Sequence, residues 1–173
     1  MAISGDWWKE KGILPNIPIL GPEKGVKMFR GEYEHNIDEK GRVLLPVKYR
    51  DELGDTVVLA RGGDGQINLF PKAFFDDMER RIEESGDSES FRLASRFLSA
   101  AIECEVDRQG RIVIPPTLRR HAKLSAEVII AGNRHRVEIW NPELWLQTYD
   151  RWVTQFRESP DDSTKIRQIG PAV

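Results

Sequence analysis

The 173-residue sequence has a single cysteine, Cys104, and so cannot form an internal disulfide. Small secreted proteins usually carry an even set of cysteines, so a lone thiol favours a reducing compartment and predicts a cytoplasmic protein. The first residues lack a basic segment followed by a continuous apolar stretch, so no secretory signal is expected. No apolar run reaches membrane length either, and we expect no membrane partner.

The sequence also has no large excess of charge of either sign. The 26 Lys and Arg residues stand against 28 Asp and Glu, which gives a formal net charge of -2 at pH 7. Total charge therefore provides no general attraction to nucleic acid, and any binding to a polyanion must come from a local patch. With 39% hydrophobic residues, the chain can bury a core, and its length fits one ordinary domain or two small ones.

Patterns that catalysis or cofactor binding would need are scarce. The three histidines, His35, His121 and His135, show no metal-ligand spacing with one another or with Cys104. No serine-centred catalytic motif occurs, and the glycine-rich segment at 62–65 lies between two predicted strands, which favours a hairpin loop over a nucleotide site. We therefore expect no enzyme activity, metal, cofactor or small-molecule ligand.

The most informative feature that the sequence does have is an internal repeat. The segment DEKGRVLLP at 38–46 returns at 107–115 as DRQGRIVIP. Aspartate, glycine, arginine and proline are identical in place, and the three aliphatic positions stay aliphatic. The residues before each motif, 33–37 and 102–106, alternate apolar and polar side chains, which is a strand pattern. Two copies of one small unit therefore follow each other.

Each copy predicts the same elements. In Asp-x-x-Gly the aspartate hydrogen-bonds the local backbone and the glycine allows a positive φ, so the motif predicts a turn that closes a hairpin. The strand that leaves the turn is apolar at consecutive positions, so we expect it to be central and buried on both faces. A proline ends this strand, and 47–53 and 116–124 are expected to form short helices with Leu53, Leu118 and Ala122 facing inward. The further predicted strand pairs are 56–61 with 66–70 and 127–131 with 135–140.

Helical patterns lie between and after the two copies. Apolar residues recur at helical spacing on both sides of a polar break near 85–88, which predicts a helical hairpin. Asn141-Pro142 is a good helix start, and the aromatic stripe that follows is expected to serve core or subunit packing. The stripe consists of Trp145, Tyr149, Trp152 and Phe156.

The expected organisation follows from these patterns. A mobile extension at 1–27 precedes a first domain at 28–75, a helical connector at 76–100, a second domain at 101–146, and a C-terminal helix and tail at 147–173.

Two arginines are the strongest candidates for binding a ligand. Arg42 and Arg111 directly follow the turn glycines, so each side chain starts at a predicted hairpin tip. A guanidinium is a planar fork of donors that matches a phosphate oxyanion or the acceptor pair of guanine. Lys40 and Arg108 add charge to the same tips. The alternative is that each arginine pairs with the aspartate of its own turn and only braces that turn.

Charge is segregated along the chain. Residues 107–123 contain five Lys or Arg against one acid, whereas residues 72–92 contain four against seven. A basic β face opposite an acidic helical layer would orient the protein on a polyanion. The alternative is that these runs are ordinary solvated surfaces.

These motifs resemble those of the MraZ family, bacterial transcriptional regulators with tandem SpoVT-AbrB domains. The resemblance rests on Met28-Phe29-Arg30-Gly31-Glu32-Tyr33, the two Asp-x-x-Gly-Arg motifs, the helices between them and the Trp-rich exit helix, and it covers about residues 28–152. It implies an α+β fold of tandem AbrB-like swapped-hairpin β-barrel units, joined by a helical hairpin and followed by a C-terminal helix. It also implies a ring-shaped homo-oligomer. Family members typically begin near Met28, which makes residues 1–27 an extension.

The resemblance implies a function as well. It points to sequence-specific binding of short direct repeats in double-stranded promoter DNA, as a nucleoid-associated repressor of the cell-division and cell-wall gene cluster and of its own promoter. The DNA-contacting positions fall on Lys40, Arg42 and Arg111. Because Gln109 stands where the first copy has Lys40, Arg108 is the candidate second basic residue of that tip. The alternatives are an antitoxin-type module that binds a toxin protein, against which the duplicated motif argues, and a structural ring indifferent to DNA.

Overall fold

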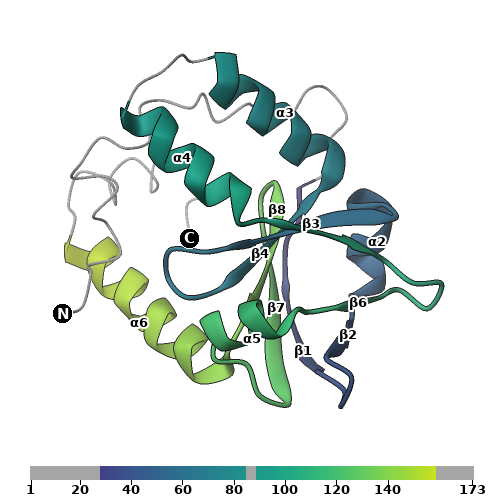
Figure 1. Cartoon of the computed structure of the whole chain (residues 1–173). Coiled ribbons are helices and arrows are strands. Elements are labelled where there is room, and N and C mark those ends of the chain that lie inside the picture. Colours follow the sequence, from purple (N-terminus) through teal and green to yellow (C-terminus); the bar gives the residue numbers. More distant parts are fainter. Residues whose placement is uncertain (1–27, 85–88, 159–173) are drawn as a thin grey trace. The chain divides into compact units, whose positions relative to one another are not determined.

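The computed structural model describes residues 28–84 and 89–158 (Figure 1). They fall into two compact units, one ending at Asn141 and the other beginning at Pro142. The predicted mobile extension at 1–27 and the part of the predicted C-terminal tail after 158 lie outside this range.

The first unit has an α+β fold with two antiparallel sheets. Its strands are β1 Glu32–Asn36, β2 Arg42–Leu44, β3 Thr56–Arg61, β4 Ile67–Pro71, β5 Ile102–Glu105, β6 Arg111–Val113, β7 Glu127–Asn133 and β8 Arg136–Trp140. The larger sheet has the strand order β1-β7-β8-β4-β3-β5, with β1 and β5 as its edges, and the smaller sheet pairs β2 with β6. The hairpins β3–β4 and β7–β8 confirm the predicted strand pairs. Among the described residues, the strand pairing closes no barrel.

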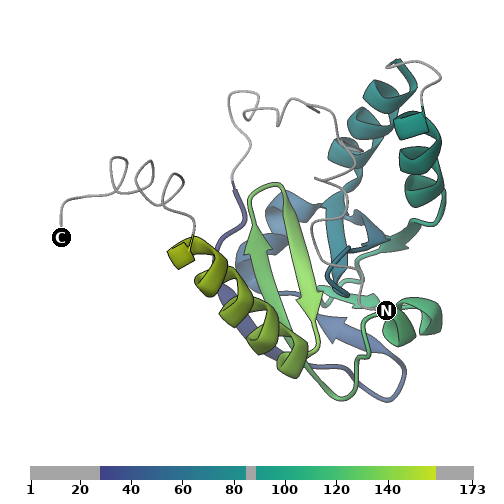
Figure 2. The same ribbon diagram turned by 90° about the vertical axis from the view of Figure 1, so that its left-hand side faces the viewer.

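Four helices accompany the described strands of this unit: α2 Val47–Leu53, α3 Lys72–Glu84, α4 Glu89–Ser99 and α5 Pro116–His121. The helices α3 and α4 lie side by side on either side of 85–88 (Figures 1 and 2), which confirms the helical hairpin. They cover one face of the larger sheet, where Phe75 packs with Val58, Ala60 and Phe70.

The two copies of the repeat exchange their first strands. The strand β1 of the first copy pairs with β7 of the second, with Tyr33 opposite Ile130. The strand β5 of the second copy pairs with β3 of the first, with Cys104 opposite Val57. The strands β4 and β8 then join the two halves of the sheet. Neither copy therefore completes its sheet without the other.

The main core lies between the larger sheet and the β2–β6 pair, which we call the ribbon. Side chains from the inner face of the sheet meet side chains of the ribbon strands and of the short helices α2 and α5. The predicted inward positions Leu53, Leu118 and Ala122 are all buried. The ribbon side of this core is formed by Val43, Leu45, Ile112 and Ile114.

The prediction that β2 and β6 are central strands buried on both faces is wrong. They form the outer layer of the core, so Val43 and Ile112 face inward while Leu44 and Val113 are 41% and 49% exposed. Three consecutive aliphatic residues therefore do not indicate a strand buried on both faces here, because the middle residue of the three in each motif points to solvent.

The prediction that each turn closes a hairpin with the strand before it is also wrong beyond the turn itself. A single bridge joins Ile37 to Val43, after which β1 pairs with β7 and β2 pairs with β6. The strands β1 and β2 diverge beyond the turn because β1 is hydrogen-bonded into the larger sheet and β2 into the smaller one.

A tyrosine of α2 fixes the segment that precedes β1. The hydroxyl of Tyr49 donates toward the carbonyl oxygens of Arg30 and Gly31, at 2.9 and 2.7 Å. Its ring meets those of Phe29 and Tyr33 edge to face, with centroids 5.5 and 5.4 Å apart. Burial raises the pKa of Tyr49 to about 12, so the hydroxyl keeps its proton and its donor role at neutral pH.

The second unit is the helix α6, Pro142–Glu158. The ring of Trp145 lies 6.1 Å from that of Tyr149 and 5.9 Å from that of Trp152, which confirms the predicted stripe; the side chain of Phe156 lies outside the described residues. In the part of the chain that the structure describes, no helix has the length and apolar character needed to span a membrane.

The close approach of the Phe29–Gly31 segment to β7 generates a stability prediction. A Cβ at Gly132 would overlap the backbone of Phe29 and Arg30 and lie 2.8 Å from the hydroxyl oxygen of Tyr49. We expect Gly132→Ala to lower the free energy of unfolding by about 1–3 kcal/mol, the usual cost of overpacking, in urea denaturation. The matched control is Gly63→Ala, because a Cβ there meets nothing within 4 Å. Equal losses in the two variants would contradict the packing described here.

Candidate nucleic-acid interface

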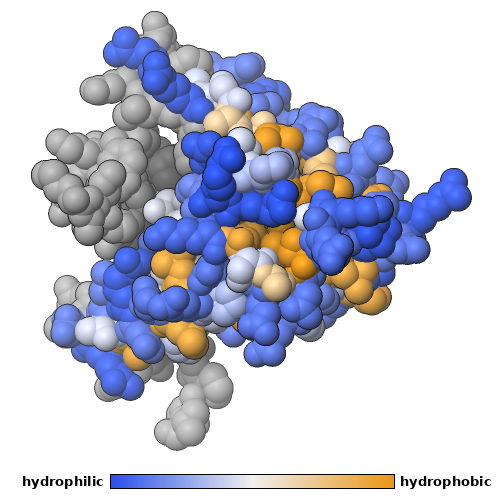
Figure 3. Space-filling model, turned by 60° about the horizontal axis from the view of Figure 1, so that its bottom comes forward, coloured by the Kyte–Doolittle hydropathy of each residue, from blue (hydrophilic) through white to orange (hydrophobic). Residues whose placement is uncertain are grey.

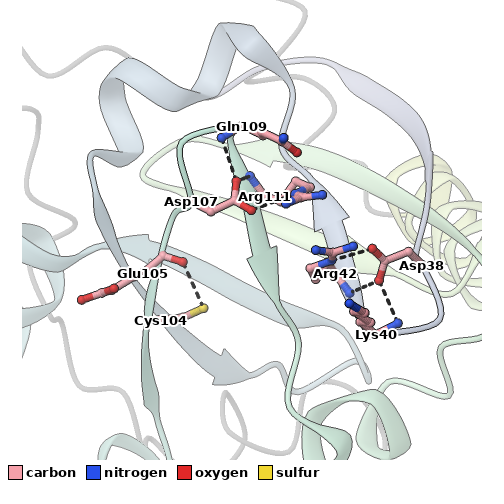
Figure 4. Close-up of polar contacts among 8 residues, drawn as sticks. All are labelled: Asp38, Lys40, Arg42, Cys104, Glu105, Asp107, Gln109 and Arg111. Atoms are coloured by element: carbon pink, nitrogen blue, oxygen red, sulfur yellow. Dashed lines mark hydrogen bonds and ion pairs between the residues drawn. The ribbon is translucent and has the colours of Figure 1, made fainter.

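The first Asp-x-x-Gly-Arg motif folds into a tight turn around Asp38 (Figure 4). Its Oδ1 accepts hydrogen bonds from the backbone N–H groups of Lys40 and Arg42, at 3.0 and 2.9 Å, and its Oδ2 accepts one from Nε of Arg42 at 2.6 Å. The N–H of Gly41 donates to the Asp38 carbonyl oxygen at 2.9 Å, and Gly41 has φ +77°, which other residues resist. The aspartate thus shapes the turn and positions the arginine.

The second motif repeats this geometry. The Oδ1 of Asp107 accepts from the backbone N–H groups of Gln109 and Arg111, both at 2.9 Å, and its Oδ2 accepts from Nε of Arg111 at 2.8 Å. Gly110 has φ +80°. The predicted turns are confirmed in both copies, and we call residues 38–42 and 107–111 the two tips.

Each arginine does pair with the aspartate of its own turn, as the bracing alternative predicts. The hydrogen bond engages Nε, which is only one of the several N–H donors of a guanidinium. The side chains of Arg42 and Arg111 remain 29% and 27% exposed. Bracing the turn and contacting a ligand are therefore compatible in this geometry.

The same contacts lower the pKa of both aspartates below the ordinary value. For Asp38 the largest cause is the hydrogen bond from the backbone N–H of Arg42, to which the Arg42 side chain adds. For Asp107 the corresponding cause is the backbone N–H of Arg111. Both carboxyl groups are therefore charged at neutral pH, and both ion pairs are present.

Backbone hydrogen bonds tie each tip to the other copy of the repeat. The N–H of Leu45, just after β2, donates to the carbonyl oxygen of Gly110, and the N–H of Ile114, just after β6, donates to that of Gly41. Both distances are 2.9 Å. Each turn glycine is thereby held by the end of the opposite ribbon strand, and the two tips lie at opposite ends of one ribbon.

Sequence reasoning missed two arginines that lie against the tips. Arg50 of α2 packs against Gly110, and Arg119 of α5 packs against Gly41, where a Cβ would lie 3.0 Å from Cζ of Arg119. The Nε of Arg50 donates to the carbonyl oxygen of Leu45 at 2.9 Å. A signal was available, because each arginine stands at the same place after the proline of its copy. Each tip thus gathers a further guanidinium from the opposite copy.

The remaining predicted site residues lie within the turns. The side chains of Lys40 and Arg108 are exposed. Gln109 takes the place of Lys40 in the second tip and uses its backbone N–H in the same way. The structure therefore brings two predicted cationic side chains together at each tip, Lys40 with Arg42 and Arg108 with Arg111.

The acidic residues of α3 lie away from the ribbon. The helix packs on the face of the larger sheet opposite the ribbon core, and much of its negative charge is matched locally. Arg80 pairs with Asp77 and Glu84, and Lys72 bridges Asp76 and Glu103 at 2.9 and 2.8 Å.

The candidate catalytic residue types do not converge. Within 28–84 and 89–158, no three His, Cys, Asp or Glu side chains are placed to hold a metal ion. Cys104 and His35 are both half-buried, and Cys104 packs against the main core. Burial raises the pKa of Cys104, and burial together with the charge of Arg50 lowers the pKa of His35.

Acid should open the two tips. The folded-state pKa of Asp38 and Asp107 lies below the unfolded value of about 4, so their contribution to stability is present above that pH and is lost as the pH falls through the lowered pKa. We expect the urea midpoint of the wild type to fall more steeply below about pH 4 than that of Asp38→Asn/Asp107→Asn, which cannot titrate at these positions. Asp51→Asn, at an exposed residue of α2, is the control and should follow the wild type. Parallel pH profiles for the wild type and the double variant would contradict this account.

Comparison with known proteins places these features in a family. The chain matches the family model described as "MraZ protein, putative antitoxin-like" twice, over residues 28–97 and 97–167. Each match contains one Asp-x-x-Gly-Arg motif, so the internal repeat and the family repeat coincide.

Relatives named transcriptional regulator MraZ are similar over most of their length. The protein of Thermoanaerobacter pseudethanolicus is 41% identical over 135 residues, which span 76% of this chain and 93% of the relative. That of Caldanaerobacter subterraneus subsp. tengcongensis is 43% identical over 122 residues, 68% of this chain and 84% of the relative. That of Pediococcus pentosaceus is 39% identical over 131 residues, 75% and 92% respectively. The double match and this identity over most of the chain show that the protein belongs to the MraZ family.

Proposed function

We propose that this protein is a transcriptional regulator that binds double-stranded promoter DNA through the two tips of its ribbon. The observation that carries the proposal is the pair of nearly identical tips on one ribbon, each with a partly exposed arginine side chain and a second, exposed cation. The naming of its relatives as transcriptional regulators supports the same conclusion, and none of these three is named as an enzyme.

The chemistry of the tips suits DNA. Phosphate contacts supply affinity and register, whereas contacts to base edges supply sequence choice. An arginine fork can bind guanine in the major groove through two acceptors, worth about 1–3 kcal/mol of discrimination for each good contact. In this proposal Arg42 and Arg111 make the selective contacts, and Lys40 and Arg108 bind phosphates.

Assembly would multiply these contacts. In this proposal the protein forms a ring-shaped homo-oligomer, and neighbouring protomers bind neighbouring direct repeats in the DNA. Once one protomer is bound, the others are held at a high effective concentration near their repeats, so that individually weak contacts add. The bound ring would exclude RNA polymerase from the protein's own promoter and from that of the cell-division and cell-wall gene cluster, and so repress transcription. The protein would act in the cytoplasm, associated with the nucleoid. The exchange of β1 and β5 between the copies supports the tandem swapped-hairpin arrangement that the family resemblance implies.

Fluorescence anisotropy with the DNA upstream of the protein's own gene tests this function. The wild type should prefer that duplex over a scrambled one and lose affinity steeply with salt, with a slope of about 0.9 per phosphate contact. A partner other than DNA, such as the toxin protein of an antitoxin-type module, predicts no such preference at any salt concentration.

The variant Arg42→Ala separates DNA contact from turn bracing. We expect it to weaken binding to the upstream duplex by about tenfold or more, because a bidentate contact is lost, while the oligomer persists in light scattering. The matched control is Asp38→Asn, which breaks the same ion pair but keeps the guanidinium. Bracing alone predicts that both variants lose DNA binding equally, and that result would contradict direct contact by Arg42.

A further inference from the structure

The open face of the ribbon carries two aliphatic side chains that the proposed function does not use. Leu44 and Val113 are 41% and 49% exposed, although the residues next to them in each strand, Val43 and Ile112, are fully or almost fully buried. Figure 3 shows that the face it presents has hydrophobic residues exposed among hydrophilic ones. Single exposed aliphatic side chains are common on protein surfaces, but these two recur at the same place in both copies, beside the candidate binding arginines.

The strand register places each of these side chains directly opposite an arginine. Arg42 of β2 faces Val113 of β6, and Leu44 of β2 faces Arg111 of β6. Directly opposed side chains in an antiparallel pair have Cβ atoms about 5 Å apart. The open face is therefore a compact patch of two cations and two aliphatic groups, arranged alike in the two copies.

This combination restricts the partner. The N–H donors of the two guanidinium groups that their aspartates do not engage suit a partner with anions or acceptors, and the aliphatic groups suit an apolar contact within a few ångströms of them. The major groove of DNA offers both, because phosphates and guanine acceptors lie beside the 5-methyl group that thymine alone among the four bases carries. The groove also admits a two-stranded ribbon. A protein partner fits less well, because stable protein interfaces bury on the order of 1,200–2,000 Å² around an apolar centre, and the patch described here offers two aliphatic side chains.

We infer that Leu44 and Val113 determine sequence specificity by contacting thymine methyl groups in the major groove, next to the groups bound by Arg42 and Arg111. This inference rests on the proposed DNA-binding function and adds to it a second kind of base recognition. Each tip then selects a thymine beside its arginine contact, so a site is recognised by its methyl groups as well as by its hydrogen-bond acceptors.

The test removes the methyl groups from the DNA and the side chains from the protein. The upstream duplex is amplified once with dTTP and once with dUTP, because uracil pairs as thymine does but lacks the 5-methyl group. Anisotropy is then measured for the wild type, Leu44→Ala, Val113→Ala and the control Val47→Ala, whose residue is 73% exposed and lies on α2, outside the ribbon.

The wild type should bind the uracil duplex about fourfold more weakly for each methyl group contacted, which corresponds to the burial of one methyl-sized group. Leu44→Ala and Val113→Ala should bind the thymine duplex more weakly and discriminate less between the two duplexes. Val47→Ala should discriminate as the wild type does. The substitutions lie at exposed positions, and unchanged urea midpoints verify that the variants fold.

Three results would overturn the inference. Equal affinity of the wild type for the two duplexes, with its preference for upstream DNA intact, would reject methyl recognition while leaving the proposed function standing. No preference for upstream over scrambled DNA would reject the proposed function itself. Loss of the oligomer in light scattering for Leu44→Ala or Val113→Ala would assign this face to contact between copies of the chain.

Discussion

The two copies of the repeat are joined into one fold by an exchange of strands. Because β1 pairs with β7 and β5 with β3, the copies share one sheet and one main core. The same exchange brings β2 against β6 and lets Leu45 and Ile114 hold the carbonyl groups of the opposite turn glycines. The two tips are consequently parts of one ribbon, with their spacing and direction set by both copies together. A binding surface arranged in this way loses little conformational entropy when it meets a ligand.

Electrostatics at the tips combines two roles in one residue. The ion pair with aspartate restricts each arginine to a narrow range of orientations, while the exposed part of the guanidinium stays accessible. The carboxylate reduces the positive charge of the tip, and Lys40, Arg108 and the arginines of α2 and α5 restore it. A chain with a net charge of -2 can thus present positive charge where it is needed, because many acids of α3 are matched by their own helix's cations.

The sequence predicts those features of the fold that depend on local rules. The Asp-x-x-Gly turns, the short helices after each proline, the hairpins β3–β4 and β7–β8 and the helical hairpin all follow from residue type and spacing within a few positions. The choice of strand partner does not, because the two copies are so alike that local pattern cannot say which copy a strand joins. The error over the burial of Leu44 and Val113 has this cause, since the pairing of β2 with β6 places both strands in an outer layer with one face open. The repeated position of Arg50 and Arg119 could be read from the sequence, but their contact with the opposite tip depends on how the two copies pack.

Hydrogen–deuterium exchange on the full chain, with and without the duplex upstream of its gene, can show without any substitution whether the ribbon and its tips bind DNA. We expect slower amide exchange in residues 38–45 and 107–114 when DNA is bound, with α3 unaffected. Unchanged exchange in both segments under conditions where the protein binds the duplex, or protection confined to other parts of the chain, would contradict the assignment of the ribbon and its tips as the DNA-binding surface.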